Sequence, residues 1–426
     1  MFRLVVCAVI FVMFAGCGDA GSEPNDEASR ADVMETSDVS SGEPEGDAGL
    51  EVAEDGVEDT ESEDTAPVSP LPQGELSEVL PGGETLCARG TPFRFFVYSA
   101  DPQKVVIDFQ GGGACWNEFT CGLSGAIFSD STGDLDEIQG AMDQGFLSGV
   151  YDFDNPDNPF YGWTLIHVPY CTGDIHWGDA TVEYSDDLTI HHRGYRNAMA
   201  VFDWMAEYYP NAERVVSTGC SAGAYGAIGH APALADIYPD AQLTVIADGG
   251  SGVITDDFLS GSFPNWNAEA NMPMDLEGIA GVAIEDLTLV DFYVAVAKAY
   301  PDIRVAQHTT AYDKDQIFYY ATMGGDEAQF NENLVGSLES IRAQADNFRY
   351  YLAPGPIHCI HPYDITYSRE VDGVVYSDWV RQLVDGETAP DVVVCEGDCR
   401  NDPICEGCLD GSFESLSCGW CDGWVP

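Results

Sequence analysis

Basic residues are scarce in this sequence. Its 426 residues include 16 Lys and Arg against 73 Asp and Glu, a formal net charge of −57 at pH 7. Lysine occurs only at Lys104, Lys298 and Lys314. A surface this acidic repels the phosphates of DNA and RNA, so the composition excludes a nucleic-acid partner. An excess of acidic residues is typical of a solubility adaptation.

The apolar run at the N-terminus is too short to cross a bilayer as a permanent helix. It covers residues 4–14, after a positively charged start, and ends just before Ala15-Gly16-Cys17. The run predicts an export signal, and small residues before a cysteine resemble the processing box of bacterial lipoproteins. We therefore expect a signal peptide over residues 1–16 and a lipid on the Cys17 thiol. The product would be a bacterial lipoprotein at the cell surface or in the periplasm, in contact with the membrane only through its lipid. An ordinary signal peptide that contains a cysteine is the alternative, and it also exports the protein.

Aromatic and large aliphatic residues are nearly absent from the segment that follows. Residues 18–64 contain 18 Asp or Glu and one Arg, and such a segment cannot bury enough apolar surface to offset its loss of entropy on folding. Repulsion between its charges favours an extended chain, and Pro67, Pro70 and Pro72 stiffen its end. We predict a disordered acidic tether over residues 17–80, ahead of a folded domain over residues 81–390.

Within residues 81–390, short runs rich in β-branched and aromatic residues alternate with longer mixed segments. This alternation predicts a mostly parallel α/β sheet with helices on both faces. Residues 195–208 and 222–237 are expected to be helical, and we find no internal repeat. The expected strands are residues 93–98, 104–109, 163–168, 214–217, 242–247, 303–307 and 348–352.

The 14 cysteines predict disulfides rather than metal sites. Cys7 is lost with the signal and Cys17 carries the lipid, which leaves an even number in an oxidising compartment. Six of them fall in a short Cys-rich C-terminal segment, residues 391–426, where Cys-x2-Cys pairs at residues 405–408 and 418–421 are also compatible with zinc. We favour three disulfides, whose pairing the sequence leaves open, and we expect no metal and no cofactor.

The sequence Gly219-Cys220-Ser221-Ala222-Gly223 has the G-x-S-x-G pattern of a nucleophile elbow. It follows an expected strand and opens an expected helix, which is the context that this turn requires. The sharp turn crowds the backbone, so small residues must flank the serine. We predict that Ser221 is a nucleophile whose hydroxyl projects above the sheet, and that the Ala222 N–H points into the site.

A second glycine-rich loop follows the expected strand at residues 104–109. Gly111-Gly112-Gly113 would let backbone N–H groups approach a substrate closely, as in the loop that completes an oxyanion hole. A disulfide between Cys115 and Cys121 would hold the loop in place.

Three residues near these loops are candidates for the wall of a substrate pocket. Trp116 and Asn117 lie within the segment that the Cys115–Cys121 bond would close, and Trp177 lies in the loop after the strand at residues 163–168. His176 and the two aspartates of that loop are conceivable metal ligands. Their spacing matches no recognised metal site, so we do not expect an ion there.

A serine nucleophile needs a base and a carboxylate that orients the base. α/β-Hydrolases place these residues after later strands, in the order Ser, acid, His. Asp313 follows the expected strand at residues 303–307 and His358 follows that at 348–352, so we assign them as acid and base. The rivals are Asp248, which comes one strand early, and His361, three residues beyond His358.

The same residues resemble the pectin acetylesterase family, which includes the Notum-type carboxylesterases. The resemblance covers about residues 87 to 365 and implies an α/β-hydrolase-like fold with Ser221, Asp313 and His358 as the triad. It also implies an oxyanion hole from the backbone of Gly112, Gly113 and Ala222. Many relatives carry Trp directly before the first matching cysteine, where this chain has Ala114. The matching motifs are Gly111-Gly112-Gly113 with Cys115, Tyr170-Cys171-x-Gly173 with Gly178-Asp179, Gly219 through Gly223, Tyr312-Asp313-x-x-Gln316, and His358-Cys359.

Together these features predict a monomeric serine esterase that removes a short acyl group, foremost acetyl, from an acylated carbohydrate or a small ester. From residue 81 onward the chain has 53 acidic and 14 basic residues. It would not attract polygalacturonate, the acidic chain of pectin, and an ester on a neutral glycan fits this charge better. Within enzymes, the alternative is a long-chain acyl esterase of the Notum type. Outside enzymes, it is a surface lipoprotein that binds glycans without catalysis.

Overall fold

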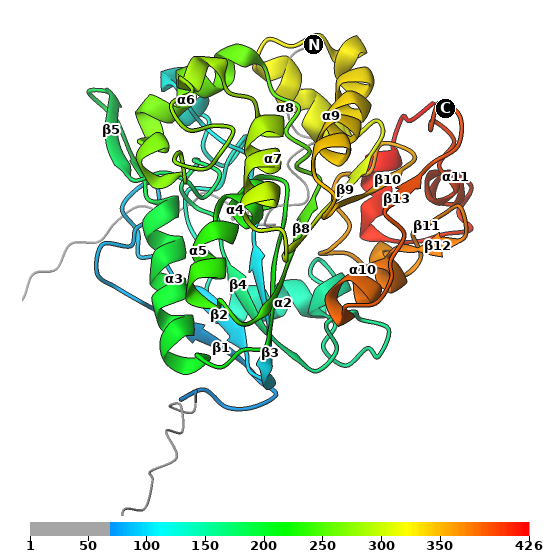
Figure 1. The fold of residues 1–426 in the computed structure, drawn as a ribbon, viewed down its shortest axis with the longest axis horizontal. Helices are drawn as coiled ribbons and strands as arrows, with labels where there is room; N and C mark the ends of the chain where they lie inside the picture. The colour runs from blue at the N-terminus through cyan, green and yellow to red at the C-terminus, as the bar shows by residue number, and fades with distance from the viewer. Residues whose placement is uncertain (1–68, 426) are drawn as a thin grey trace, which may run out of the picture. The chain divides into compact units, whose positions relative to one another are not determined.

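The computed structural model describes residues 69–425, and the expected signal peptide, Cys17 and the tether up to residue 68 lie outside the described residues. A central sheet of nine strands has the order β1-β2-β4-β3-β7-β8-β9-β10-β13 (Figure 1). The strands are β1 (Leu76–Val79), β2 (Phe95–Tyr98), β3 (Asp101–Phe109), β4 (Trp163–Val168), β7 (Arg214–Cys220), β8 (Gln242–Asp248), β9 (Arg304–Thr310), β10 (Phe348–Ala353) and β13 (Val392–Val394).

The sheet is parallel from β4 across to β13. Only the pairs β1–β2 and β2–β4, at one edge, are antiparallel. Every residue of β4 is buried, and so is all of β8 except its first residue. Such continuous burial is typical of parallel strands covered on both faces. The predicted mostly parallel α/β sheet is therefore confirmed.

All seven expected strands are present, and β4 has the predicted bounds. The strands β7 and β9 each extend three residues beyond the predicted C-terminal end, because the ladder of β7 with β8 continues to Cys220 and the ladder of β9 with β10 continues to Thr310, through less apolar residues. Two edge strands were not expected. β1 lies in the segment expected to be tether and pairs with β2, so the sheet begins before residue 81. β13 lies in the Cys-rich C-terminal segment and pairs with β10.

Helices cover both faces of the sheet (Figure 1), as predicted. Alternate side chains of β7 show this. The Ser217 hydroxyl donates to the Ala227 carbonyl of α4 (Ala222–Gly229) on one face. On the opposite face Thr218 bonds to His361, which in turn bonds to the Tyr376 hydroxyl of α10 (Tyr376–Asp385). Among the described residues, no helix combines the length and the apolar character needed to span a bilayer. The helices are α1 (Glu118–Cys121), α2 (Leu135–Asp143), α3 (Gly194–Tyr208), α4 (Ala222–Gly229), α5 (Ala231–Ile237), α6 (Asp256–Trp266), α7 (Leu289–Ala299), α8 (Lys314–Thr322), α9 (Phe330–Gln344), α10 (Tyr376–Asp385) and α11 (Pro403–Asp410).

The helix expected over residues 222–237 is divided into α4 and α5 at His230. Pro232 explains the break, since its ring has no N–H to donate and collides with the carbonyl one turn earlier. Two short antiparallel hairpins lie outside the main sheet: β5 (Ala180–Ser185) with β6 (Leu188–His192), and β11 (Glu370–Val371) with β12 (Val374–Val375).

All twelve cysteines among the described residues form disulfides, as the sequence predicts. The Cys115–Cys121 bond is present, and the six cysteines of the C-terminal segment pair with one another, which confirms disulfides in place of a zinc site. The pairs are Cys87–Cys171, Cys115–Cys121, Cys220–Cys359, Cys395–Cys399, Cys405–Cys421 and Cys408–Cys418.

Candidate active site

Ser221 lies on the sharp turn between β7 and α4, at the edge of the sheet where the parallel strands end. Its backbone φ of 56° is one that residues with side chains rarely adopt. A Cβ on Gly219 would meet the backbone of Gly223 at 2.5 Å, and Gly223 itself leaves no room for a side chain against the Phe109 carbonyl. The strand, the strained serine and the helix have the geometry of a nucleophile elbow, and its glycines are those that the turn requires.

Asp313 and His358 lie on the loops that follow β9 and β10. Nδ1 of His358 is 2.8 Å from Oδ2 and 2.9 Å from Oδ1 of Asp313, whose side chain is completely buried. Asp313 caps the N-terminus of α8, where Oδ1 accepts the backbone N–H groups of Asp315 and Gln316. The Gln316 side chain donates to Oδ2 at 2.8 Å. These donors fix the carboxylate, which can then hold an imidazole with its proton on Nδ1 and leave Nε2 for another partner.

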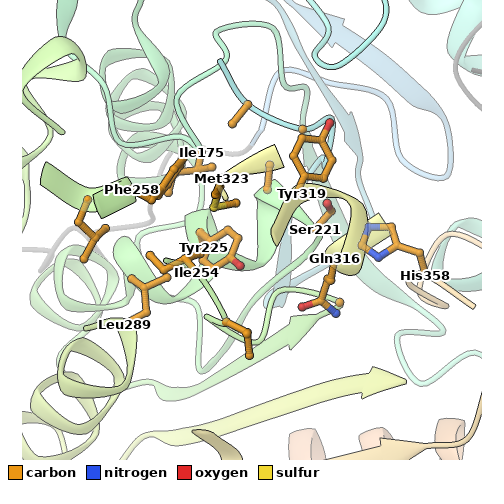
Figure 2. A pocket seen from close by; sticks show the side chains of 16 residues that line it. Ile175, Ser221, Tyr225, Ile254, Phe258, Leu289, Gln316, Tyr319, Met323 and His358 are labelled. Atoms are coloured by element: carbon orange, nitrogen blue, oxygen red, sulfur yellow. The ribbon is translucent and has the colours of Figure 1, made fainter. Parts of the chain in front are cut away.

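Ser221 and His358 are connected through their neighbours in the sequence. Cys220 and Cys359 form a disulfide, so the residue before the serine is covalently bonded to the residue after the histidine. A ring nitrogen of His358 lies within 4.8 Å of both sulfur atoms. Ser221 and His358 also line the same cavity, where Figure 2 shows the hydroxyl and the imidazole next to one another. The structure thus brings the three predicted residues together.

Three carboxylates act on the imidazole of His358. Burial on its own would lower the pKa of this histidine, but the negative charges of Asp313, Asp315 and Asp248 raise the pKa to about 9. An imidazole with this pKa is mostly protonated at pH 7, and only its neutral form can accept a proton. A reaction that uses His358 as a base should therefore be favoured at alkaline pH.

The rival residues Asp248 and His361 belong to a second buried network behind the site. One carboxylate oxygen of Asp248 lies 2.7 Å from Nδ1 of His308, and the other accepts the backbone N–H groups of Ile360 and His361, each at 2.8 Å. The backbone carbonyl of Asp248 accepts the N–H of Ser221. Asp248 therefore supports both the serine turn and the chain just after His358. Among the described residues, no hydrogen bond joins Asp248 to the His358 ring.

His361 points away from the cavity, to the opposite face of the sheet. Its ring bonds to Thr218 through Nδ1 at 2.9 Å and to the Tyr376 hydroxyl through Nε2 at 2.6 Å. Both ring nitrogens are thus engaged, and burial lowers the pKa of His361. This geometry favours a structural role for His361 and leaves His358 as the candidate base.

The glycine loop after β3 packs directly against the serine turn. A Cβ on Gly111 would meet the Cys220 carbonyl oxygen at 2.6 Å and Cβ of Ser221 at 3.0 Å. Gly113 and Ala222 line the cavity beside Ser221. Backbone N–H groups from this loop and from the start of α4 are thus in the region where an oxyanion hole is expected.

Larger side chains fix the course of this loop. A Cβ on Gly112 would meet the Tyr170 ring at 2.8 Å, and one on Gly113 would collide with the Ile127 carbonyl and the Tyr319 hydroxyl. Gly113 also has a φ of 75°, which favours glycine. The two glycines are therefore required by the close approach of neighbouring groups, and the loop is held in one conformation.

The cavity at Ser221 is predominantly apolar (Figure 2). Its polar contributors include Ser221, His358 and Gln316. The remainder of its wall comes mostly from α6, α7, α8 and the loops before them. The larger apolar side chains that line it include Ile175, Val253, Ile254, Phe258, Leu259, Leu289 and Met323.

The three residues expected in the pocket wall do not line this cavity. Trp116 packs edge-on against Phe258, with ring centroids 5.1 Å apart, so it supports the wall from behind. Trp177 is buried, and its indole N–H donates to the carbonyl of Tyr225, a lining residue. Asn117 caps α1, where its side chain accepts the Thr120 N–H. The sequence placed these residues in the correct loops but could not show which side chains face the cavity.

The loop of His176 is a packed structural element. Nε2 of His176 bonds to the Gln110 carbonyl at 2.9 Å, and burial lowers the pKa of this histidine to about 3. Asp174 accepts hydrogen bonds from the Thr172 hydroxyl and from the backbone of His176 and Gly194. These contacts already occupy the groups that a metal ion would need.

Two features of the site escaped the sequence analysis. The Cys220–Cys359 disulfide was not predicted. Both cysteines directly adjoin predicted triad residues, so convergence of the triad would itself bring them together. Gln316 was noted only as part of a motif, yet its side chain bonds to Asp313 and accepts from Ser251. Its spacing of three residues from a helix cap was the available signal.

Comparison with known proteins gives the following likenesses. Residues 82–263 match the Pectinacetylesterase family model. Pectin acetylesterases 11 and 7 of Arabidopsis thaliana are each 32% identical over 161 residues, which is 37% of this chain and 39% of the relative. The chain thus matches under two fifths of the length of these relatives. The structure of the Wnt deacylase Notum from Drosophila has a TM-score of 0.54 at 12% identity and covers 74% of this chain and 93% of that chain, which shows a shared fold.

The matched region contains the glycine loop and the serine turn, whereas Asp313 and His358 lie beyond it. The shared fold extends the likeness over most of the described residues and confirms the predicted α/β-hydrolase-like architecture. Over residues 82–263, this chain is similar to the pectin acetylesterase family.

Proposed function

We propose that this protein is a serine carboxylesterase that removes a short acyl group from a glycan or another ester. The observation that carries the proposal is the common cavity: Ser221 and His358 both line it, while Nδ1 of His358 is bonded to buried Asp313. The family match over the serine turn supports the same reading.

In the proposed reaction, neutral His358 accepts the proton of Ser221 as the serine oxygen attacks the ester carbonyl. Backbone N–H groups of Gly112, Gly113 and Ala222 stabilise the negative charge on the carbonyl oxygen. The imidazolium then protonates the departing alcohol, which leaves an acyl-serine. Water, activated by the same imidazole, releases the acid and regenerates the serine. Asp313 keeps the proton of His358 on Nδ1 throughout.

The apolar wall bears on which acyl group the site accepts. Each buried methylene contributes about 0.8 kcal/mol, so a butyryl ester should exceed an acetyl ester by about tenfold in kcat/KM. The short-acyl proposal requires octanoyl esters to react more slowly than butyryl esters. The measurement is hydrolysis of p-nitrophenyl acetate, butyrate and octanoate. The apolar lining also favours the second candidate, a long-chain esterase, and octanoate as the best substrate would replace the short-acyl proposal with it.

The alcohol side of the substrate can be tested in the same assay. Because the folded part is strongly acidic, acetate should be released faster from a neutral acetylated glycan than from acetylated polygalacturonate, most clearly at low ionic strength. Faster release from the acidic polymer at low salt would contradict the neutral-glycan assignment. It would leave the esterase chemistry itself intact.

We also propose that the protein works outside the cytoplasm, tethered by a lipid on Cys17. Six disulfides in the described residues support an oxidising compartment. We expect the full chain to incorporate labelled palmitate when expressed in a bacterium, and Cys17→Ser to lose the label and leave the membrane fraction. Cys7→Ser, in the signal, is the matched control that should keep both. Equal labelling of Cys17→Ser and the unaltered chain would refute the anchor.

A further inference from the structure

The Cys-rich C-terminal segment, residues 391–425 of the described chain, lies against the loops that carry Asp313 and His358. Its strand β13 continues the sheet beside β10, and the rest is held together by the Cys405–Cys421 and Cys408–Cys418 bonds between α11 and η6 (Leu416–Cys421). Figure 1 shows α11 at the β10–β13 side of the sheet. The segment lies beyond the family match, which ends at residue 263.

Lys314, directly after the candidate acid, is bound by the backbone of this segment. Its Nζ donates to the carbonyl oxygen of Trp420 at 2.5 Å and to that of Asp422 at 2.8 Å. The chain has only three lysines, and this one is half-buried against carbonyl groups. The two bonds hold the first residue of α8 in place, and α8 is the helix that Asp313 caps.

Two further residues near Lys314, Asp315 and Tyr312, also touch the segment. The indole N–H of Trp420 donates to Oδ2 of Asp315 at 3.3 Å. On the other side of Asp313, the Tyr312 ring lies 5.7 Å from the Trp424 ring, and the Arg400 guanidinium carbon stands 4.7 Å from the Tyr312 centroid. Residues 312, 314 and 315 therefore all contact the segment, and Asp313 lies between them.

The loop that leads to His358 is held by the same segment. The backbone N–H of Gly355 donates to the Cys399 carbonyl at 3.0 Å, and a Cβ on Gly355 would collide with the Asp402 carboxylate. Asp402 is itself fixed by a buried ion pair with Arg369, at 2.8 and 3.3 Å. Two backbone bonds, Tyr312 N–H to the Gly355 carbonyl and Lys314 N–H to the Pro356 carbonyl, join the two loops.

We propose that residues 391–425 are a positioning element for the proposed esterase site. Through Trp420, Asp422 and Trp424, the segment fixes residues 312–315 so that the Asp313 carboxylate stays on Nδ1 of His358. This role rests on the proposed function, and it assigns Lys314 and Trp420 as positioning residues that do not touch the substrate.

The segment also controls the charges near the imidazole. Asp315 is half-buried beside His358, Asp313, Lys314 and the Trp420 indole. The Trp420 N–H stabilises the Asp315 carboxylate, and that negative charge in turn favours protonated His358. Without the indole N–H, Asp315 and the neighbouring Asp313 are free to shift away from the imidazole, and the pKa of His358 should then fall.

The test uses the full chain with Trp420→Phe, which keeps the ring and every disulfide, and Lys314→Met. Leu409→Ala is the matched control, since Leu409 is 56% exposed on α11 of the same segment. Trp420→Phe and Lys314→Met should each lose about ten- to a hundredfold in kcat on p-nitrophenyl acetate, with KM within about twofold. In Trp420→Phe the midpoint of the kcat/KM pH profile should also move down from about 9. Leu409→Ala should match the unaltered protein.

Three readings of this experiment are distinct. Loss of kcat together with the lower pH midpoint in Trp420→Phe, at an unchanged melting temperature, supports positioning. If Trp420→Phe and Lys314→Met had the kcat and the pH profile of Leu409→Ala, the positioning role would be overturned and the proposed esterase function would stand. If the unaltered protein hydrolyses no ester and takes up no fluorophosphonate probe, the proposed function fails, and this role fails with it.

Discussion

Replacing Ser221 with alanine should lower kcat on p-nitrophenyl acetate by about four to six orders of magnitude. The elbow fixes the serine hydroxyl at the cavity, and no neighbouring group supplies a second oxygen nucleophile on the same turn. Alanine at residue 221 keeps the Cβ, so the backbone with its φ of 56° is no more strained than before. The disulfide between Cys220 and Cys359 is also untouched. The loss should therefore appear in kcat, with the melting temperature nearly unchanged.

Covalent labelling separates this outcome from misfolding. A fluorophosphonate probe should label the unaltered protein and fail to label Ser221→Ala, whereas Ser260→Ala, an exposed serine on α6, should label and turn over normally. Ser221→Ala with residual activity within tenfold of the unaltered protein would refute the nucleophile. An unaltered protein that binds acetylated glycans but resists the probe would favour the non-catalytic alternative.

The sequence was most informative where function depends on local backbone geometry. Gly219 and Gly223 flank Ser221 because the turn leaves no room for side chains, and that demand is visible as a five-residue pattern between a strand and a helix. Asp313 and His358 are 45 residues apart in the chain. They could be paired in advance only because parallel strands end at the same edge of a sheet, which brings their following loops together.

Features that depend on long-range packing were not accessible in this way. The sequence indicated that Cys220 and Cys359 form disulfides but not that they join each other. Trp116 and Trp177 were placed near the pocket, yet their rings support the wall from behind, and Phe258 and Tyr225 face the cavity instead. Whether an aromatic ring lies inside a cavity or behind its wall is decided by tertiary packing, which neither spacing nor composition encodes.

The role of the Cys-rich segment was hidden for a related reason. Its composition predicted disulfides and suggested a separate unit, but the contacts with Lys314 are made by backbone carbonyl groups of Trp420 and Asp422. Carbonyl acceptors are present at every residue, so they leave no trace in a sequence. The same limit applied to β13, a run of three valines whose partner strand is fixed only in the folded chain.

Asp313→Asn should lower kcat by about 10⁴ and remove the rise in activity between pH 7 and pH 9. In the unaltered protein, neutral His358 is the active form, and with its pKa near 9 the value of kcat/KM should rise about fiftyfold between pH 7 and pH 9. Asparagine removes the charge that raises this pKa, and its amide can donate a hydrogen bond to Nδ1, which would leave the imidazole in the wrong tautomer. The variant's profile should therefore level off at a lower pH, far below the rate of the unaltered protein.

Asp248→Asn is the matched control, because it is the same substitution in the rival acid. Asp248 is a buried partner of His308 and accepts two backbone N–H groups just after His358, so its loss should cost about 3–5 kcal/mol of stability. Its charge contributes less to the pKa of His358 than that of Asp313, so the rise in activity toward pH 9 should remain. The two variants thus separate stability from catalysis. Suppose instead that Asp248→Asn lost the rise in activity toward pH 9, while Asp313→Asn kept both this rise and the kcat of the unaltered protein. The acid of the triad would then be Asp248, and the pairing of His358 with Asp313 would have no catalytic role.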